Sequence, residues 1–235
     1  MDLLVVYEDD NFVAINKPAG LLVHKTTHSK ELTLVDFLLE RYPEIKKVGD
    51  EPNLRPGIVH RLDKDTSGII IVARKQAFFD YFKNLLQKHE VEKNYLVLVH
   101  GKVKPKSGCI KKPIGFKSGT VVRTVYPNKG KFFKEAITYY KVLKYFRYKD
   151  LYFSLLNLSP KTGRTHQLRV HLASLGYPVV GDQVYSKREN PWSLKRQFLH
   201  AQSLEFSLPN HRRLRIEADL PQELQSIIDN LEEER

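Results

Sequence analysis

Two short polar clusters interrupt apolar segments of this chain, and they hold the side chains best suited to chemistry. The first cluster runs from Ile58 to Lys75 and contains His60, Arg61 and Asp63. A tight turn would explain the residues Asp65 to Gly68 that follow. A turn alone does not explain Arg61 and Asp63, because charged side chains beside predicted strands tend to be partly buried and must find partners.

The second cluster runs from Thr162 to Tyr185, with Gly163 and Arg164 at the start of a predicted helix. This position fixes the Arg164 side chain to a defined element. His166 and His171 follow, but they are five residues apart, whereas a helical zinc site needs an i, i+4 pair, and no carboxylate or thiolate accompanies them. We therefore predict that no metal is bound and that these histidines are structural or contact RNA.

Motifs for other chemistries are absent from the sequence. No GxxxxGK[ST] loop, no glycine-rich turn suited to a dinucleotide and no GxSxG elbow occurs. Gly115, Gly119 and Gly130 lie among lysines, without the context that such motifs require. We therefore predict that no cofactor is used, and that any reaction depends on carboxylate, guanidinium and aromatic groups.

The composition limits the class of protein. With 235 residues and 41% apolar content, the chain can bury a sizeable core as one large or two small domains. No stretch approaches the roughly 20 apolar residues of a membrane span. The single cysteine, Cys109, excludes an internal disulfide and is typical of a reducing compartment. We expect a cytoplasmic protein with no membrane partner.

The formal net charge of +12 is concentrated between Lys102 and Lys134, where ten basic residues occur without an acidic one. Such a stripe favours a polyanionic partner. A solvated lysine-rich surface would give the same pattern, so charge supports nucleic-acid binding without proving it. The predicted RNA contacts within this stripe are Lys111, Lys112 and Lys117.

Hydrophobic periodicity predicts a mixture of strands and helices. A hairpin is expected over residues 3–17, with its turn at 8–11, followed by a short strand at 21–24. One helix should begin after Thr33, with Asp36 completing a capping box, and end before Pro43. Further helices are expected at about 76–89, 165–175 and 221–231. Further strands are expected at 68–73, 94–101, 135–146, 151–159 and 198–208.

Because these strands come in runs, the predicted class is α+β with a mixed, largely antiparallel sheet. The segment from Lys102 to Lys134 is interpreted as an insertion between two strands. On the third helix, leucines 168, 172 and 175 should form the core stripe, which places Arg169 and Val170 on other faces.

The polar signature HRLDKDTSG, from His60 to Gly68, resembles that of the RluA family of pseudouridine synthases. Four further blocks resemble other family segments in the same order, so that the match covers most of the chain. A nine-residue polar signature with four ordered companions is far more specific than one short motif. The companion blocks are Glu8 to His24, Lys93 to Gly101, Thr162 to Asp182 and Leu199 to Pro209.

The resemblance implies a fold, a partner and an activity. The implied fold is a mixed, largely antiparallel sheet in two halves with flanking helices and a central catalytic cleft. Residues 1–235 would form a single catalytic domain, without the small N-terminal RNA-binding domain that some members carry. The expected activity is isomerisation of a uridine in tRNA or rRNA to pseudouridine, by a protein that we expect to be a monomer and to need no cofactor.

The resemblance also implies roles for individual residues. Asp63 matches the essential aspartate, and Arg164 matches the arginine that pairs with it. Arg61 matches the arginine that helps to hold the target nucleotide out of its helix, and Tyr95 matches the tyrosine that packs on the flipped base. Taken alone, Tyr95 would be interpreted as a core aromatic of an alternating strand. The predicted RNA contacts outside the lysine stripe are His60, Arg61 and Arg169.

Three mechanisms and two other functions remain open at this point. Asp63 could attack the sugar C1′, attack the base C6, or stabilise positive charge on the sugar. One alternative function is an RNA-binding or chaperone protein without catalysis. The other is a ribonuclease in which His60 and His166 act as acid and base. Strand cleavage distinguishes the ribonuclease from the isomerase, which releases the C5 hydrogen.

Overall fold

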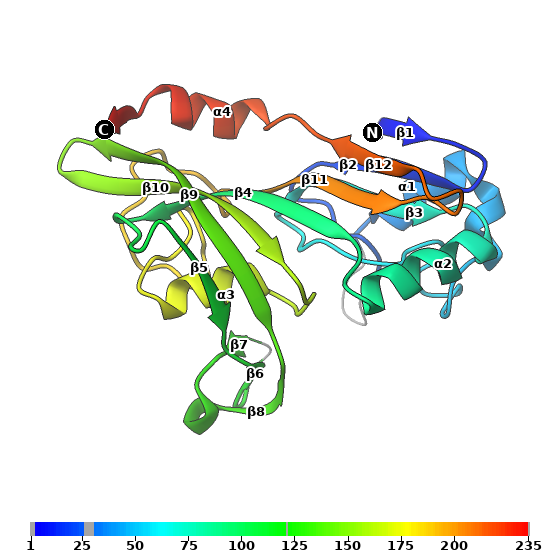
Figure 1. Ribbon diagram of the computed structural model, residues 1–235, viewed down its shortest axis with the longest axis horizontal. Helices are drawn as coiled ribbons and strands as arrows, with labels where there is room; N and C mark the ends of the chain where they lie inside the picture. The colour runs from blue at the N-terminus through cyan, green and yellow to red at the C-terminus, as the bar shows by residue number, and fades with distance from the viewer. Residues whose placement is uncertain (1–2, 26–30, 121, 235) are drawn as a thin grey trace. The chain divides into compact units, whose positions relative to one another are not determined.

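The computed structural model describes residues 3–25, 31–120 and 122–234 of the chain (Figure 1). The chain folds into two compact units. Unit 1 comprises Met1–Glu92 with Ala201–Asp219, and unit 2 comprises Lys93–His200 with Leu220–Arg235. The second unit is therefore inserted into the first along the sequence.

Unit 1 is built on strands in the order β1-β2-β3-β11, with β12 paired to β11. The pairs β1–β2, β2–β3 and β11–β12 are antiparallel. The predicted hairpin forms around Asp9, whose carboxylate accepts the amides of Asn11 and Phe12. The strands are β1 (Leu4–Glu8), β2 (Phe12–Lys17), β3 (Ser67–Ala73), β11 (Leu199–Ser207, in unit 1 from Ala201 on) and β12 (Arg213–Glu217).

A glycine allows β3 to lie against β11. Gly68 has a φ of +117°, and a Cβ atom there would stand 2.2 Å from the carbonyl oxygen of Ala201. Any side chain would therefore collide with backbone, which cannot move away as a flexible side chain could. This close approach explains why the polar signature ends in glycine.

The core of unit 1 is aromatic. Helix α2 (Gln76–Gln87) presents Phe78 and Phe82 to the sheet. The Phe78 ring stacks on Phe12 with centroids 4.5 Å apart, and the Phe82 ring meets Phe206 edge-on at 4.8 Å. Helix α1 (Leu34–Arg41) begins with the predicted capping box, in which the Asp36 carboxylate accepts the Thr33 amide at 2.8 Å. It leads into the short 3-10 helix η1 (Pro43–Lys47).

Unit 2 contains the antiparallel strands β4-β10-β9-β13 of the ten-stranded sheet, with β5 also paired to β9. The apolar residues of β4 and β10 pack with those of α3 in one buried cluster. The elements are β4 (Glu92–His100), β5 (Ser107–Lys111), β9 (Ile137–Tyr148), β10 (Leu151–Pro160), α3 (Gln167–Ser174), α4 (Gln222–Asp229) and β13 (Glu232–Glu234).

The basic stretch between Lys102 and Lys134 contains β5 and a small sheet of its own. This sheet has the order β7-β6-β8, and β8 leads directly into β9 (Figure 1). Its elements are β6 (Ile114–Lys117), β7 (Arg123–Thr124), the 3-10 helix η2 (Pro127–Lys129) and β8 (Gly130–Lys134).

The predicted α+β class with a largely antiparallel sheet is confirmed. Several details of the prediction were wrong. Residues 21–24 form no strand, because only Leu22 makes an isolated bridge, to Thr33. Strands β5 to β8, β12 and β13 were not predicted. Among the described residues, no helix is long and apolar enough to cross a membrane.

Candidate active site

The loop that carries Arg61 and Asp63 lies in unit 1, immediately before β3. The Nε2 atom of His60 accepts the amide of Ile71 on β3 at 2.9 Å, which holds the start of the loop. The amide of Thr66 donates to the carbonyl oxygen of Asp63 at 3.1 Å, which closes a turn after it. Asp63 is half-buried and Arg61 is exposed, so both side chains face solvent within a fixed backbone.

A buried lysine fixes the far side of this loop. The Lys17 side chain is fully buried, and its ammonium donates to the carbonyl oxygens of Pro18 at 2.7 Å, Leu21 at 2.9 Å and Lys64 at 2.9 Å. The amide of Gly20 also donates to the Lys64 carbonyl oxygen, at 3.0 Å. The residue next to Asp63 is thereby tied to the end of β2.

Sequence reasoning missed Lys17. The available signal was a lysine in an alternating apolar strand, directly before a proline and a glycine turn. A buried ammonium must find acceptors, and carbonyl oxygens of a turn can provide them. Which carbonyls these are depends on the fold.

His24 lies close to Arg61 in unit 1. Burial lowers the pKa of His24, and the positive charges of Arg61 and Arg55 lower it further. The imidazole is therefore neutral near pH 7. Its Nδ1 atom is buried and has no hydrogen-bond partner among the described residues. His24 thus adds a neutral, polar group beside the Arg61 side chain.

Tyr95 and Arg164 belong to unit 2. Tyr95 stands on β4 opposite Leu158 of β10, is half-buried, and packs against the apolar core of this unit. Arg164 follows the end of β10 and is exposed. Its Nε atom donates to the carbonyl oxygen of Glu135 at 2.9 Å. The expected pairing of Arg164 with Asp63 stays a prediction.

The Arg164 loop is positioned by Gln167, the first residue of α3. Its Oε1 atom accepts the Arg164 amide at 3.0 Å and the Thr162 hydroxyl at 2.8 Å. Its Nε2 atom donates to the carbonyl oxygen of Ile137 and to the Thr138 hydroxyl, both at 3.0 Å. One buried amide therefore links the loop to β9, and Gln167 is a second positioning residue that sequence reasoning missed.

The structure gives Arg169 a different role from the predicted one. Its side chain is 6% exposed, and its guanidinium makes two bonds to the fully buried Asp182 carboxylate, at 2.7 and 2.9 Å. Burial alone would raise the pKa of Asp182, but this pair and the amides of Val184 and Tyr185 lower it. The RNA contact predicted for Arg169 would require this ion pair to open, so the placement supports a structural role. Val170 is also buried, contrary to the predicted core stripe.

The histidines of the second cluster are engaged within the protein. His171 is fully buried, with Nε2 at 2.9 Å from the Lys112 carbonyl oxygen and Nδ1 at 3.0 Å from the Thr138 hydroxyl. Burial lowers the pKa of His171, so the ring is neutral. His166 has its Nδ1 atom at 2.9 Å from the Tyr185 hydroxyl. These contacts support the structural interpretation of both residues.

The three predicted lysine contacts differ in their surroundings. Lys111 on β5 and Lys117 on β6 are exposed. Lys112 is half-buried, and its ammonium lies 3.2 Å from both the carbonyl oxygen and the hydroxyl of Ser174. Lys111 and Lys117 are therefore better placed than Lys112 to contact RNA phosphates.

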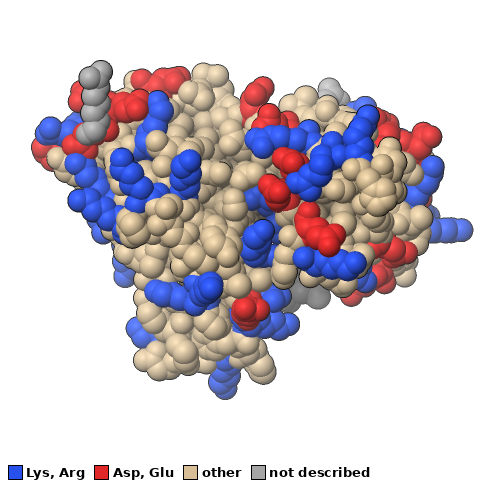
Figure 2. Space-filling view, viewed as in Figure 1, with Lys and Arg blue, Asp and Glu red and all other residues tan. Residues whose placement is uncertain are grey.

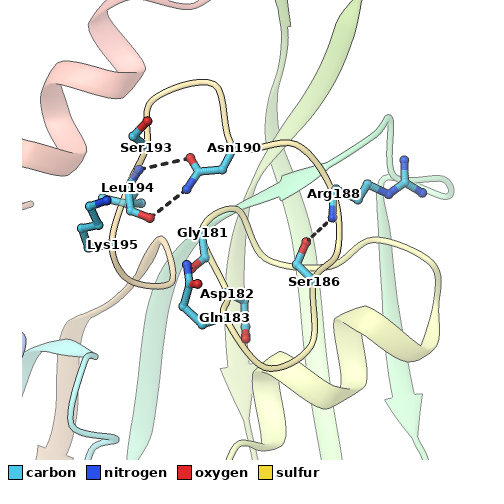
Figure 3. A pocket seen from close by; sticks show the side chains of 9 residues that line it. All are labelled: Gly181, Asp182, Gln183, Ser186, Arg188, Asn190, Ser193, Leu194 and Lys195. Atoms are coloured by element: carbon cyan, nitrogen blue, oxygen red, sulfur yellow. Dashed lines mark hydrogen bonds between the residues drawn. The ribbon is translucent and has the colours of Figure 1, made fainter.

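A cavity of about 510 Å³ lies in unit 2 beside the loop that follows α3 (Figure 3). The side chain of Asn190 shapes this loop by bonding both the amide and the carbonyl oxygen of Leu194. Neither Tyr95 nor Arg164 lines the cavity. It is therefore separate from the candidate catalytic side chains of this unit.

Comparisons with known proteins agree on one family. The family model described as RNA pseudouridylate synthase matches residues 11–174. An uncharacterized RNA pseudouridine synthase of Chloroflexus aurantiacus is 42% identical, over 93% of this chain and 66% of its own length. The ribosomal large subunit pseudouridine synthase D of Nitrosomonas europaea is 39% identical, over 96% of this chain and 64% of its own length. The chain thus spans slightly less than two thirds of these two relatives.

A solved structure agrees in fold. Human RNA pseudouridylate synthase domain containing 1 superposes with a TM-score of 0.79 at 28% sequence identity, and the match covers 99% of this chain and 89% of that one. The matched segment 11–174 includes all four candidate residues, Arg61, Asp63, Tyr95 and Arg164. The chain belongs to the RNA pseudouridylate synthase family and is of the RluA type.

Proposed function

We propose that this protein isomerises a uridine of a structured RNA to pseudouridine, with Asp63 as the catalytic carboxylate. The observation that carries the proposal is the position of Asp63 in the family signature, on a loop whose backbone is fixed by His60 and by the buried Lys17 ammonium. A half-buried carboxylate on a rigid loop can be held in reacting geometry at no further ordering cost.

The reaction requires few groups. The C1′–N1 bond breaks, the uracil rotates, the C1′–C5 bond forms, a proton leaves C5 and N1 takes up a proton. A carboxylate can attack C1′ or C6 or stabilise a cationic sugar. These routes remain alternatives for Asp63. Arg164 is the proposed cationic partner of this carboxylate.

The target nucleotide must leave its stack before C1′ is accessible, at a cost of a few kcal/mol. We propose that Arg61 helps to hold it out and that the Tyr95 ring packs on the extruded base. Arg61 is exposed and Tyr95 is half-buried, which suits a guanidinium that meets RNA and a ring that is partly accessible. Burial and the charge of Arg61 lower the pKa of His24, so this imidazole adds no competing charge near pH 7.

The RNA class is inferred from the relatives. Several of them are named ribosomal large subunit pseudouridine synthase D, so we propose a uridine of large-subunit rRNA ahead of one in tRNA. We also propose that a single catalytic domain acts as a monomer without a cofactor. Cys109 is an exposed free thiol, which supports a cytoplasmic location.

The two histidines of the ribonuclease alternative each have one ring nitrogen bonded within the protein. His60 uses Nε2 to accept a backbone amide, and His166 places Nδ1 against the Tyr185 hydroxyl. Because one engaged nitrogen is compatible with proton exchange at the other, strand cleavage is the test of this alternative.

The test uses ribosomal RNA transcribed with uridine tritiated at C5. The proposed isomerase releases tritium to water and leaves the strand intact. Cleaved strands without tritium release would identify a ribonuclease. Binding with neither product would identify a protein that only holds RNA. Mapping pseudouridines in total RNA from cells with and without the gene then identifies the position modified.

A further inference from the structure

The small sheet of β6, β7 and β8 exposes aromatic rings next to its basic side chains. Phe132 is 78% exposed, Tyr126 is 49% exposed and Phe116 is 41% exposed. Large apolar rings are usually buried, and a group of them on a surface indicates an interaction site. On the face drawn in Figure 2, Lys and Arg side chains appear with uncharged ones between them at the end of unit 2 where Figure 1 draws β6 and β8.

Cations lie directly over two of these rings. The Arg123 guanidinium is 3.5 Å from the centroid of the Phe116 ring, and the Lys129 ammonium is 5.5 Å from that of Tyr126. Both contacts are within the range of cation–π attraction. Positive charges therefore lie against exposed aromatic rings of the small sheet and of the turn beside it.

A β-bulge turns Phe132 toward solvent. In the pairing of β6 with β8, Phe116 stands opposite Lys131, but Ile114 stands opposite Lys134. The single residue Gly115 thus faces both Phe132 and its neighbour Phe133. A bulge of this kind redirects the side chains of its strand.

The two phenylalanines of the bulge have opposite environments. Phe133 lies against the sheet, since a Cβ atom on Gly115 would stand 2.9 Å from its ring. Phe132 has a φ of +55° and is the most exposed large apolar side chain described. A bulky residue rarely adopts a positive φ. The backbone therefore holds Phe132 outward at a local cost instead of burying it.

We propose that this face of the small sheet, centred on Phe132, binds unpaired bases of the substrate RNA by stacking. The proposal rests on the proposed function, which makes RNA the substrate. Base stacking on aromatic rings tolerates any sequence, and a neighbouring positive surface follows the backbone. The exposed Lys117, Lys129 and Lys131 provide that surface. Their charge favours RNA over a protein partner, because charged residues are depleted at the core of protein interfaces.

The aromatic ring of Phe132 and the lysines should affect RNA binding in different ways. Phosphate contacts depend on salt and do not distinguish paired from unpaired RNA. Stacking requires a free base face, so Phe132 should add affinity only for unpaired segments. The small sheet would in this way favour a site in which the target uridine lies near unpaired nucleotides.

The test measures the affinity of the full chain for a short oligoadenylate and for a fully paired RNA duplex, at several salt concentrations. Phe132→Ala should weaken binding of the oligoadenylate by about fivefold or more. Its affinity for the duplex and its salt slope should equal those of the wild type. Phe132→Tyr should restore binding, whereas Phe132→Leu, which is apolar but not aromatic, should not.

Tyr152→Ala is the matched control, because Tyr152 on β10 is also an exposed ring beside a lysine, with Lys102 4.2 Å from its centroid. It should bind both RNAs as the wild type does. Equal affinity of wild type and Phe132→Ala for the oligoadenylate would overturn the proposal and leave the face to another partner. Equal losses for both RNAs with a flatter salt slope would also overturn it, because Phe132 would then only support the lysines.

Failure of the stacking proposal can be distinguished from failure of the proposed isomerase activity. If the wild type releases tritium from C5 and Phe132→Ala binds normally, only the stacking proposal fails. If the wild type binds RNA with the predicted preference but releases no tritium, only the isomerase activity fails.

Discussion

Replacing Lys17 by methionine tests how the Asp63 loop is held. Methionine keeps the unbranched apolar stem of the side chain and removes the ammonium. The carbonyl oxygens of Pro18 and Leu21 then lose this donor, while that of Lys64 keeps the amide of Gly20.

The expected change in the free energy of unfolding follows from these contacts. Each bond from a charged donor contributes about 1.5 to 3 kcal/mol, and a buried acceptor that loses its donor costs about 1 to 3 kcal/mol. Removing the buried charge also removes the free-energy cost of its desolvation, which offsets part of the loss of stability. We expect the free energy of unfolding to fall by about 2 to 4 kcal/mol, a large share of the 5 to 15 kcal/mol of a typical domain.

The assay combines urea unfolding with hydrogen exchange of the Gly20 and Thr66 amides, which bond to the Lys64 and Asp63 carbonyl oxygens. Both amides should exchange faster in Lys17→Met, and kcat should fall more than affinity for RNA. Lys83→Met is the control, since it removes an exposed ammonium of unit 1 that pairs with Asp50 at 2.9 Å. If both variants lose less than about 1 kcal/mol and keep the same amide protection, Lys17 does not hold the loop.

Three further predictions concern charge. Arg164→Ala should lower kcat more than it lowers affinity for RNA, because the proposed role of Arg164 is to pair with the catalytic carboxylate; an unchanged kcat with weaker binding would place Arg164 on phosphate. Neutralising Lys111 and Lys117 together should flatten the salt slope of RNA binding by about 1.4 to 1.8 with unchanged turnover at saturating RNA, and a wild-type slope would exclude these contacts. Burial, assisted by the charge of Arg188, lowers the pKa of His100 to about 4, so its contribution to stability is present above about pH 6.5 and is lost as the pH falls toward 4. Urea unfolding at pH 7.5 and pH 5 should show the wild type losing about 2 kcal/mol more than His100→Phe, and equal losses would refute the assignment.

Much of the fold could be predicted because its signals are local. The spacing of Phe78 and Phe82 predicts the face that α2 buries, and Thr33 with Asp36 predicts where α1 begins. The start of α3 was predicted two residues early. His166 has a φ of +57°, so the helix begins only at Gln167.

Two of the missed strands are rich in charge. Strand β13 is three glutamates, whose side chains reach Lys144 at 2.6 Å and Lys102 at 2.5 Å. Neither β-propensity nor alternation indicates a strand there, and its partner β9 lies far away in the sequence. Strand β12 pairs with the neighbouring β11, and Arg213 pairs with Glu205 at 2.8 Å. Its alternating charges conceal this hairpin in the sequence.

The residues of the candidate site also differ in whether the sequence alone identifies them. Asp63 and Arg164 could be identified because the blocks around them are specific. The groups that position them could not, since Lys17 and Gln167 act through backbone atoms that the sequence does not specify. The buried ion pair of Arg169 could not be predicted for a related reason: its partner Asp182 lies thirteen residues away in a loop.

Tritium release from C5 by the wild type and by Asp63→Asn tests the central claim most directly. The substitution preserves size and removes the charge, so the protein should fold and bind RNA, because phosphate contacts dominate affinity. We predict steady release by the wild type and none detectable from Asp63→Asn at equal occupancy of RNA. Release by Asp63→Asn within about tenfold of the wild-type rate would contradict the role of this carboxylate.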